Sequence, residues 1–166
     1  MTTAEVPWAA VVASDAALAE YVERRFSTIC YLATVRADGN PRVHPVGVMF
    51  RRGRALVAMG ANSRKAGDLR ADGRYAVHCT VEDSRGGAGE VLLRGRAAEV
   101  DAPEDFVAQG WLAFELRIAE ILTVRRDAAS ELVVAHWRPD GARSGRLEPA
   151  LGDRASRGDG RRGGGR

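Results

Sequence analysis

The residue types best able to do chemistry are concentrated in one short stretch, Asn62-Ser63-Arg64-Lys65. It places a hydroxyl, a guanidinium and an ammonium at the start of a helix-like segment, and Lys65 is the one lysine among 25 basic residues. The first backbone N–H groups of a helix have no partner within the helix, and they lie at the positive end of its dipole. We therefore predict an anion site suited to a terminal phosphate. The alternative is that Ser63 caps the helix and the two cations are solvated.

A second set of polar groups lies on the strand-like run Arg42-Val43-His44-Pro45-Val46. Alternation along a strand puts Arg42, His44 and Val46 on one face. Taken alone, His44 is best explained as a hydrogen-bonded structural residue. Pro45 lacks a backbone N–H, which favours an edge strand that a ligand can approach. Together with an anion site at the end of the next strand, these residues favour ligand binding.

Periodic patterns predict the elements that must position these residues. A first helix is expected after the capping oxygens of Ser14 and Asp15, with Leu18, Val22 and Phe26 at four-residue spacing. Strands are expected at 29–36, 42–50, 55–59, 75–81, 90–100, 114–125 and 131–137, and further short helices at 63–71 and from residue 101. The lack of an alternating βαβ pattern favours a mainly β fold, a closed or nearly closed antiparallel barrel with short flanking helices.

Composition is that of an ordinary globular protein. The chain has 166 residues, of which 45% are hydrophobic and 28% charged, and this length fits one domain. No apolar run approaches the roughly 20 residues that a membrane helix needs, and the N-terminus lacks the pattern of a signal peptide. We expect a cytoplasmic protein without a membrane partner.

The net charge of +3 comes from the C-terminal end of the chain. Residues 143–166 contain seven arginines and three acidic residues, whereas residues 1–142 are close to neutral. Because this Gly/Arg-rich end has few apolar residues to offset the entropy of ordering, we predict a folded domain at 1–142 and a disordered tail at 143–166. Contact of the tail with RNA or acidic surfaces would be unspecific, so no specific nucleic-acid partner is expected.

Cys30 and Cys79 lie in apolar, strand-like runs. A cytosolic setting disfavours a disulfide, so both are predicted to be buried free thiols. There is no C-x-x-C and no His/Cys cluster with zinc spacing, and no metal site is predicted. The sequence also lacks a G-x-S-x-G elbow, an H-E-x-x-H helix and a G-x-G-x-x-G turn after a strand, so the catalytic residues stay unknown.

Three segments together resemble the pyridoxamine 5′-phosphate oxidase-like flavin-binding split barrels. They are the hairpin YLATVRADGNPRVHPVGVMF, the strand–helix–strand LVAMGANSRKAGDLRADGRYAVHC and the strand GEVLLRGRAAEV. The resemblance runs from about Phe26 to Trp137 and implies an antiparallel six- to seven-stranded split β-barrel. It also implies a homodimer with two FMN sites at its interface.

The resemblance also implies roles for individual positions. The strand that matches 42–46 would lie along the ring and ribityl chain of the cofactor, and the positions that match 63–65 would hold its phosphate. The implied cofactor-binding residues are Arg42, Val43, His44, Pro45, Val46, Met59, Ser63, Arg64 and Lys65. Glu90 stands where some members carry an amide that contacts the ring.

The implied activity is hydride or electron transfer between a reduced cofactor and an unknown small molecule. Members of the wider group bind the deazaflavin F420 or haem, so an F420-dependent reductase and a non-catalytic carrier stay open. The turn arginines Arg51, Arg52 and Arg54 could accommodate the acidic tail of F420.

Two further expectations concern haem and the substrate. Haem binding would use His44, His78 or His136. True pyridoxamine phosphate oxidases carry a further C-terminal segment that holds the substrate. The last strand expected here ends in LVVAHWRPDG, which predicts a different substrate.

Overall fold

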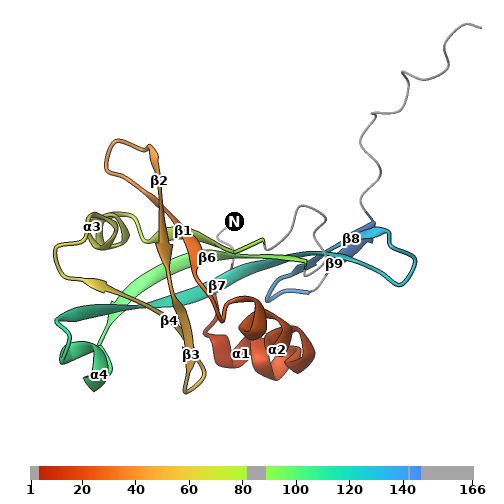
Figure 1. The fold of residues 1–166 in the computed structure, drawn as a ribbon, viewed down its shortest axis with the longest axis horizontal. Helices are drawn as coiled ribbons and strands as arrows, with labels where there is room; N and C mark the ends of the chain where they lie inside the picture. Colours follow the sequence, from red (N-terminus) through yellow and green to blue (C-terminus); the bar gives the residue numbers. More distant parts are fainter. Residues whose placement is uncertain (1–3, 82–88, 142, 147–166) are drawn as a thin grey trace, which may run out of the picture.

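The computed structural model describes residues 4–81, 89–141 and 143–146, the last of these as backbone only. Most of these residues lie in strands, which short helices flank (Figure 1). The strands are β1 (Cys30–Val35), β2 (Pro41–Val46), β3 (Val48–Arg51), β4 (Arg54–Gly60), β5 (Arg74–Cys79), β6 (Glu90–Val100), β7 (Trp111–Arg126), β8 (Leu132–Trp137) and β9 (Arg143–Arg146). The helices are α1 (Trp8–Ser14), α2 (Ala16–Arg25), α3 (Arg64–Ala71) and α4 (Glu104–Val107).

The direct link from β2 to β3 curls the sheet into a barrel. The strands follow the order β2-β1-β5-β6-β7-β4-β3 with antiparallel pairing throughout, and β8 and β9 extend the sheet from β7. β2 and β3 therefore lie at opposite ends of this order, yet only Gly47 separates them in the sequence. Because the chain passes directly from one edge to the other, the sheet curls into a barrel that is split between β2 and β3. The expected antiparallel split barrel is confirmed.

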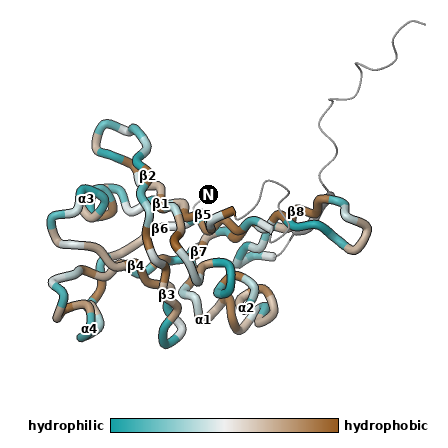
Figure 2. Tube along the Cα trace, viewed as in Figure 1, coloured by the Kyte–Doolittle hydropathy of each residue, from teal (hydrophilic) through white to brown (hydrophobic). Residues whose placement is uncertain are grey.

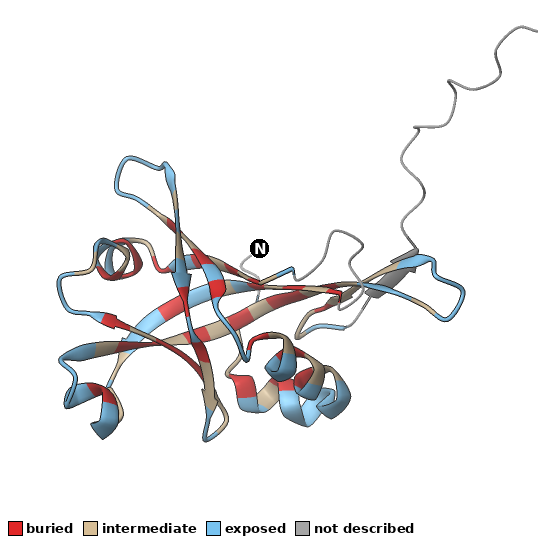
Figure 3. Cartoon of the chain, viewed as in Figure 1, coloured by how far each residue is buried: buried red, intermediate tan, exposed pale blue. Residues whose placement is uncertain are grey.

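The inward faces of the strands and the two N-terminal helices form the core. Figure 3 shows buried residues repeating along β6 and β7, and Figure 2 shows hydrophilic residues at the hairpin tips. Trp8 of α1 and Phe26 after α2 both contact the ring of Phe50, at centroid distances of 4.6 and 6.4 Å. Asp15 caps α2 as predicted, because its Oδ1 accepts a hydrogen bond from the Leu18 N–H at 2.9 Å.

The two cysteines are buried and free, as predicted. They lie directly opposite each other, Cys30 on β1 and Cys79 on β5. Burial, together with the neighbouring Cys79, raises the pKa of Cys30 to about 12. The Cys30 thiol is therefore protonated and unreactive at neutral pH.

The strand expected at 42–50 is in fact two strands. Val46 and Val48 are both buried and keep the alternation of one strand, but β2 pairs with β1 whereas β3 pairs with β4. A change of hydrogen-bonding partner leaves the side-chain period unchanged, so the pattern could not reveal it. β7 also begins at Trp111, three residues before the expected start at Phe114.

Two elements were missed. The first is α1, whose apolar run has no capping side chain at its N-cap, Pro7. The second is β9, which pairs with β8 although its polar sequence, RSGR, has no apolar alternation. β9 occupies the first four residues of the predicted tail, and residues 147–166 lie outside the described part of the chain. In the part that is described, no helix has the length and apolar character needed to cross a membrane.

Candidate functional site

The register of β1 and β2 confirms that Arg42, His44 and Val46 share one face. They lie opposite Thr34, Leu32 and Cys30, which are all buried, so this face points into the barrel. β2 is the last strand at its end of the sheet, as Pro45 predicted, and its outer edge has no strand partner among the described strands. Backbone polar groups along this edge are available to a ligand.

A buried carboxylate connects β1, β2 and α3. Asp68 of α3 is 9% exposed, and its Oδ2 accepts hydrogen bonds from Arg42 Nε at 2.7 Å and from Thr34 Oγ1 at 2.8 Å. The sequence pattern gave Arg42 no partner and did not single out Asp68 or Thr34. Thr34 has the same parity as Cys30 and Leu32, which marks it as inward-facing, and a buried hydroxyl needs a hydrogen-bond partner.

No side-chain hydrogen bond caps the N-terminus of α3. Ser63 is the N-cap residue with extended dihedral angles (φ −67°, ψ 130°), but its hydroxyl makes no capping hydrogen bond. Arg64 is exposed, Lys65 is half-buried, and neither forms an ion pair with any residue that the structure describes. Arg64 also lies four residues before Asp68, so both occupy the same side of the helix, one turn apart. Ser63 therefore does not cap the helix with its side chain, whereas cations without ion-pair partners agree both with an anion site and with the solvated alternative.

The remaining predicted residues divide between the core and the outer surface. Val46 and Met59 are 6% and 4% exposed and belong to the hydrophobic core. Val43 is 58% exposed, and Pro45 is also exposed on the outer face of β2. The structure thus joins Arg42 to α3 through Asp68 and places His44 on the same inward face of β2, but the side chains of Val43 and Pro45 point the other way.

The three histidines have different surroundings. His78 Nδ1 lies 2.6 Å from the Cys79 carbonyl oxygen, and its Nε2 lies 3.5 Å from Glu90 Oε2. His136 Nδ1 lies 2.8 Å from Glu120 Oε1. Within the described residues, His44 has no hydrogen-bond or ion-pair partner, which leaves its imidazole available for a ligand. No three His, Cys, Asp or Glu side chains of the described residues come together as a metal site.

Two of the three turn arginines are already paired with acids. Arg51 Nη1 lies 2.8 Å from Asp105 Oδ2, and Arg54 Nε lies 3.3 Å from Glu115 Oε2. These carboxylates neutralise much of the positive charge that could attract an acidic cofactor tail. Arg52, in the left-handed region at φ 51°, forms no ion pair among the residues described.

A second buried carboxylate, Glu120 of β7, lies beyond the residues that the sequence analysis selected. It is 8% exposed and lies 3.1 Å from Arg94, 2.8 Å from His136 and 2.8 Å from Arg138. Burial alone would raise the pKa of Glu120, but hydrogen bonds from His136 and Arg138 and the charges of Arg138 and Arg94 outweigh it and lower the pKa below 4.5.

Four surface hollows lie away from the predicted cofactor residues. One lies between α2 and β7–β8, a second between the β3–β4 turn and α4, a third beside α1, and a fourth between α3 and β6. None of these four is lined by Arg42, His44, Ser63, Arg64 or Lys65. The candidate cofactor residues are therefore separate from these four hollows.

Comparison with known proteins identifies the class to which this fold and site belong. Residues 14–144, well over half of the chain, match the sequence profile of the family described as Pyridoxamine 5′-phosphate oxidase. The chain belongs to the pyridoxamine 5′-phosphate oxidase-like FMN-binding split-barrel family. No curated protein sequence matches it.

Solved structures agree with the fold. PhzG from Burkholderia lata 383, in complex with tetrahydrophenazine-1-carboxylic acid, has a TM-score of 0.61 at 13% identity, covering 86% of this chain and 94% of that chain. A pyridoxamine 5′-phosphate oxidase-related, FMN-binding protein from Nostoc punctiforme PCC 73102 has a TM-score of 0.60 at 11% identity. The match covers 81% of this chain and 96% of that chain. A heme-binding protein from Mycobacterium smegmatis has a TM-score of 0.51 at 18% identity, covering 76% and 57%. At these identities the likeness shows the fold alone.

Replacing Asp68 with asparagine tests whether this carboxylate anchors α3. The variant leaves the guanidinium of Arg42, only 19% exposed, without its counter-charge. We expect the free energy of unfolding in urea to fall by about 2–4 kcal/mol. Asp72→Asn is the matched control, because Asp72 pairs with the exposed Arg74 and should cost far less. Equal losses in the two variants would contradict an anchoring role.

The lowered pKa of Glu120 predicts an acid-dependent loss of stability. A carboxylate whose pKa is lower in the folded state stabilises the fold above its unfolded pKa, and this contribution is lost as the pH falls through the folded value. Glu120→Gln is therefore expected to be less stable than the parent at pH 7 and to approach it in stability as the pH falls through the lowered pKa of Glu120. Urea denaturation at several pH values measures this, with Glu104→Gln on the exposed α4 as the control. A stability difference that does not change with pH would refute the assignment.

Proposed function

We propose that this protein binds FMN and transfers a hydride or electrons between a reduced cofactor and a small molecule. The observation that carries the proposal is the open N-terminus of α3, where Ser63 makes no capping hydrogen bond and Arg64 and Lys65 have no ion-pair partner among the described residues. Backbone N–H groups, the helix dipole and two cations favour a phosphate there. Arg64 offers a planar fork and Lys65 a mobile point charge.

The surroundings of α3 fit the rest of a flavin. Asp68 ties the helix to Arg42, so the phosphate site and the inward face of β2 keep a constant relation. His44, without a partner among the residues described, and the unpaired edge of β2 provide hydrogen-bonding groups for the ring or ribityl chain. A bound flavin would supply the redox chemistry, while these residues bind it, orient it and exclude water.

A second candidate, haem binding without turnover, is favoured by the surroundings of the three histidines. The imidazole of His44 has no partner among the described residues, whereas His78 and His136 are both engaged. An F420-dependent reductase also remains a candidate, because F420 and FMN share a phosphate-bearing arm. The pairing of Arg51 and Arg54 with acids weakens the case for F420.

The substrate is a small molecule. We expect it to differ from pyridoxamine 5′-phosphate, because the described chain adds only the four-residue strand β9 after β8. Pyridoxamine 5′-phosphate is then the negative control among the compounds to be tested with the reduced and oxidised protein.

We propose that the protein is a homodimer with the cofactor at the interface. Outward-facing residues of the β2-β1-β5 face include Val43, Tyr31 and Pro45, all exposed, and the first two are 58% and 48% exposed. No described helix covers this apolar face, which is unusual on a monomer surface. In the proposed dimer, a second chain covers this face.

Lys65→Ala is expected to weaken FMN binding at least about tenfold, because it removes a charged contact to the phosphate. Quenching of flavin fluorescence measures the dissociation constant. Arg70→Ala is the matched control: it removes one cation from the other end of α3, where Arg70 is held by Glu99 at 2.6 Å. Equal dissociation constants for Lys65→Ala and the parent would remove Lys65 from the site.

The absorption spectrum of the purified protein distinguishes the cofactors. Flavin absorbs near 450 nm as a general property, whereas haem gives a Soret band, and mass spectrometry of the extracted cofactor separates FMN from F420. A Soret band that is lost in His44→Ala would support the haem alternative over FMN. Reduction of the bound flavin by NAD(P)H, followed by reoxidation with an acceptor, would support an enzyme over a carrier.

Val43→Arg is expected to convert the dimer to a monomer, because it places a charge on the apolar face that the second chain would cover. Sedimentation velocity measures the change. Val107→Arg on α4 is the control, since Val107 is also exposed, at 62%, but lies away from this face. A parent protein that sediments as a monomer at micromolar concentration would contradict the proposed dimer.

A further inference from the structure

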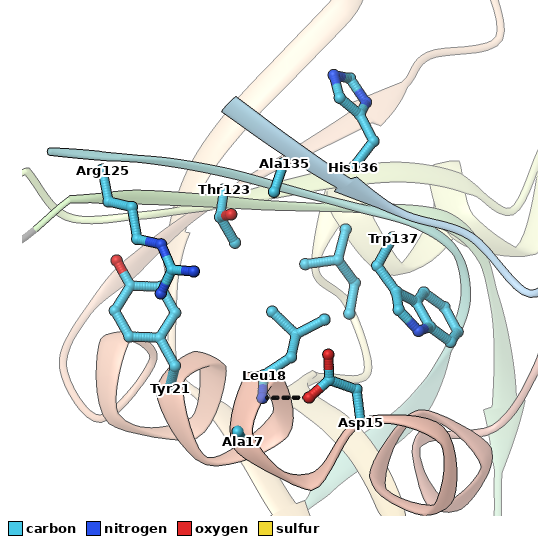
Figure 4. Close-up of a pocket in the computed structure, with 10 residues that line it drawn as sticks. Asp15, Ala17, Leu18, Tyr21, Thr123, Arg125, Ala135, His136 and Trp137 are labelled. Atoms are coloured by element: carbon cyan, nitrogen blue, oxygen red, sulfur yellow. Dashed lines mark hydrogen bonds between the residues drawn. The ribbon is translucent and has the colours of Figure 1, made fainter. Parts of the chain in front are cut away.

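A separate cavity of about 250 Å³ lies between α2 and the strands β7 and β8 (Figure 4). Its apolar walls are formed by Leu18 from α2, Ile121 from β7 and the indole of Trp137 from β8. The indole is held in place, because Trp137 Nε1 donates a hydrogen bond to Ser14 Oγ at 3.1 Å. This volume is slightly below the roughly 300–1,000 Å³ of pockets for drug-sized ligands, so it suits a molecule with one ring.

One side of the cavity carries donors for an anion. Thr123 projects from β7 into it and is only 3% exposed, and its hydroxyl forms no hydrogen bond with any residue that the structure describes. Because Thr123 lines the cavity, its hydroxyl is available to hydrogen-bond with a ligand there. Arg125 lies on the same side, with its guanidinium 5.8 Å from the centroid of the Tyr21 ring.

The opposite side carries an acceptor. Asp15 lies beside Trp137 in Figure 4, across the cavity from Arg125. One carboxylate oxygen of Asp15, Oδ1, accepts the Leu18 N–H, and Oδ2 forms no hydrogen bond with the residues described. His136 also borders the cavity, but its ring points away and contacts Glu120.

We propose that this cavity binds a small aromatic carboxylate that carries a hydrogen-bond donor at its far end. Arg125 and the Thr123 hydroxyl bind the carboxylate, which needs a cation and a donor. The ring packs between Leu18, Ile121 and Trp137, and Asp15 accepts from the distal hydroxyl or amino group. A neutral apolar molecule would gain no polar contact from Thr123 and Arg125, and a ligand without a donor would gain none from Asp15 Oδ2.

The cavity is independent of the proposed cofactor site. Arg42, His44 and the residues at the N-terminus of α3 do not line the cavity. Figure 1 shows α2 and α3 on different sides of the strands. Binding of an aromatic carboxylate here can therefore be measured whether or not a flavin is bound.

The probe is 4-hydroxybenzoate, titrated into the full chain while the methyl signals of Leu18, Ile121 and Thr123 are followed by NMR. We expect saturable shifts with a dissociation constant of about 1 mM or lower. The neutral isostere 4-hydroxybenzamide should bind at least about tenfold more weakly, because it lacks the charge that Arg125 recognises. Benzoate should bind more weakly than 4-hydroxybenzoate, because it offers Asp15 no donor.

Two matched arginine variants locate the anion. Arg125→Gln should weaken 4-hydroxybenzoate binding about tenfold. Arg24→Gln should change it by less than about twofold, because Arg24 lies at a similar distance, 5.9 Å, from the same Tyr21 ring but does not line the cavity. Thr123→Val, which keeps the shape of the side chain, should also weaken binding.

Three outcomes would overturn the proposal. The first is the absence of saturable shifts up to about 10 mM ligand. The second is a set of shifts confined to β2 and α3, which would place the ligand at the cofactor site. The third is equal weakening in Arg125→Gln and Arg24→Gln, which would assign the effect to the ring of Tyr21.

Discussion

The carboxylate of Asp68 is the constraint on which the candidate site depends. It comes from a short helix, yet it accepts hydrogen bonds from side chains on two strands, Thr34 and Arg42. Because these donors satisfy it in a largely buried position, the helix cannot shift without exposing or orphaning a charge. The position of Arg64 and Lys65 relative to His44 follows from this contact, and so does the direction in which the helix N-terminus points.

Closure of the barrel sets the second constraint. β2 and β3 belong to opposite edges of the sheet, and the chain passes between them through Gly47. This leaves the edge of β2 without a strand partner in the described fold and places it next to α3. An edge strand normally invites unwanted pairing, and here Pro45 and the inward-facing charge of Arg42 both counter it. The same edge provides the backbone groups that a ligand needs.

The two cations at the start of α3 lack acidic partners among the described residues. Most of the arginines that the sequence analysis singled out have an acidic partner in the fold, such as Arg51 with Asp105 and Arg54 with Glu115. Arg64 and Lys65 have none among the described residues, although several carboxylates lie nearby in the sequence. Cations that are left unpaired at a helix N-terminus are poised for an anion from outside the chain. The cavity between α2 and the strands β7 and β8 also presents polar groups to a ligand, with Arg125 and Thr123 on one side and Asp15 on the other.

The sequence by itself determined the antiparallel strands, the inward parity of Arg42 and His44, the cap at Asp15 and the cationic start of α3. These features depend on the two-residue and 3.6-residue periods and on local backbone chemistry, which are properties of neighbouring residues. Tertiary structure alone decided that Arg42 pairs with Asp68, that β2 and β3 join different edges, and that β9 extends the sheet. It also decided that Thr123, Arg125 and Asp15 share a cavity. Such contacts join residues far apart in the chain, and a periodic pattern states which face a side chain occupies but not what lies opposite it.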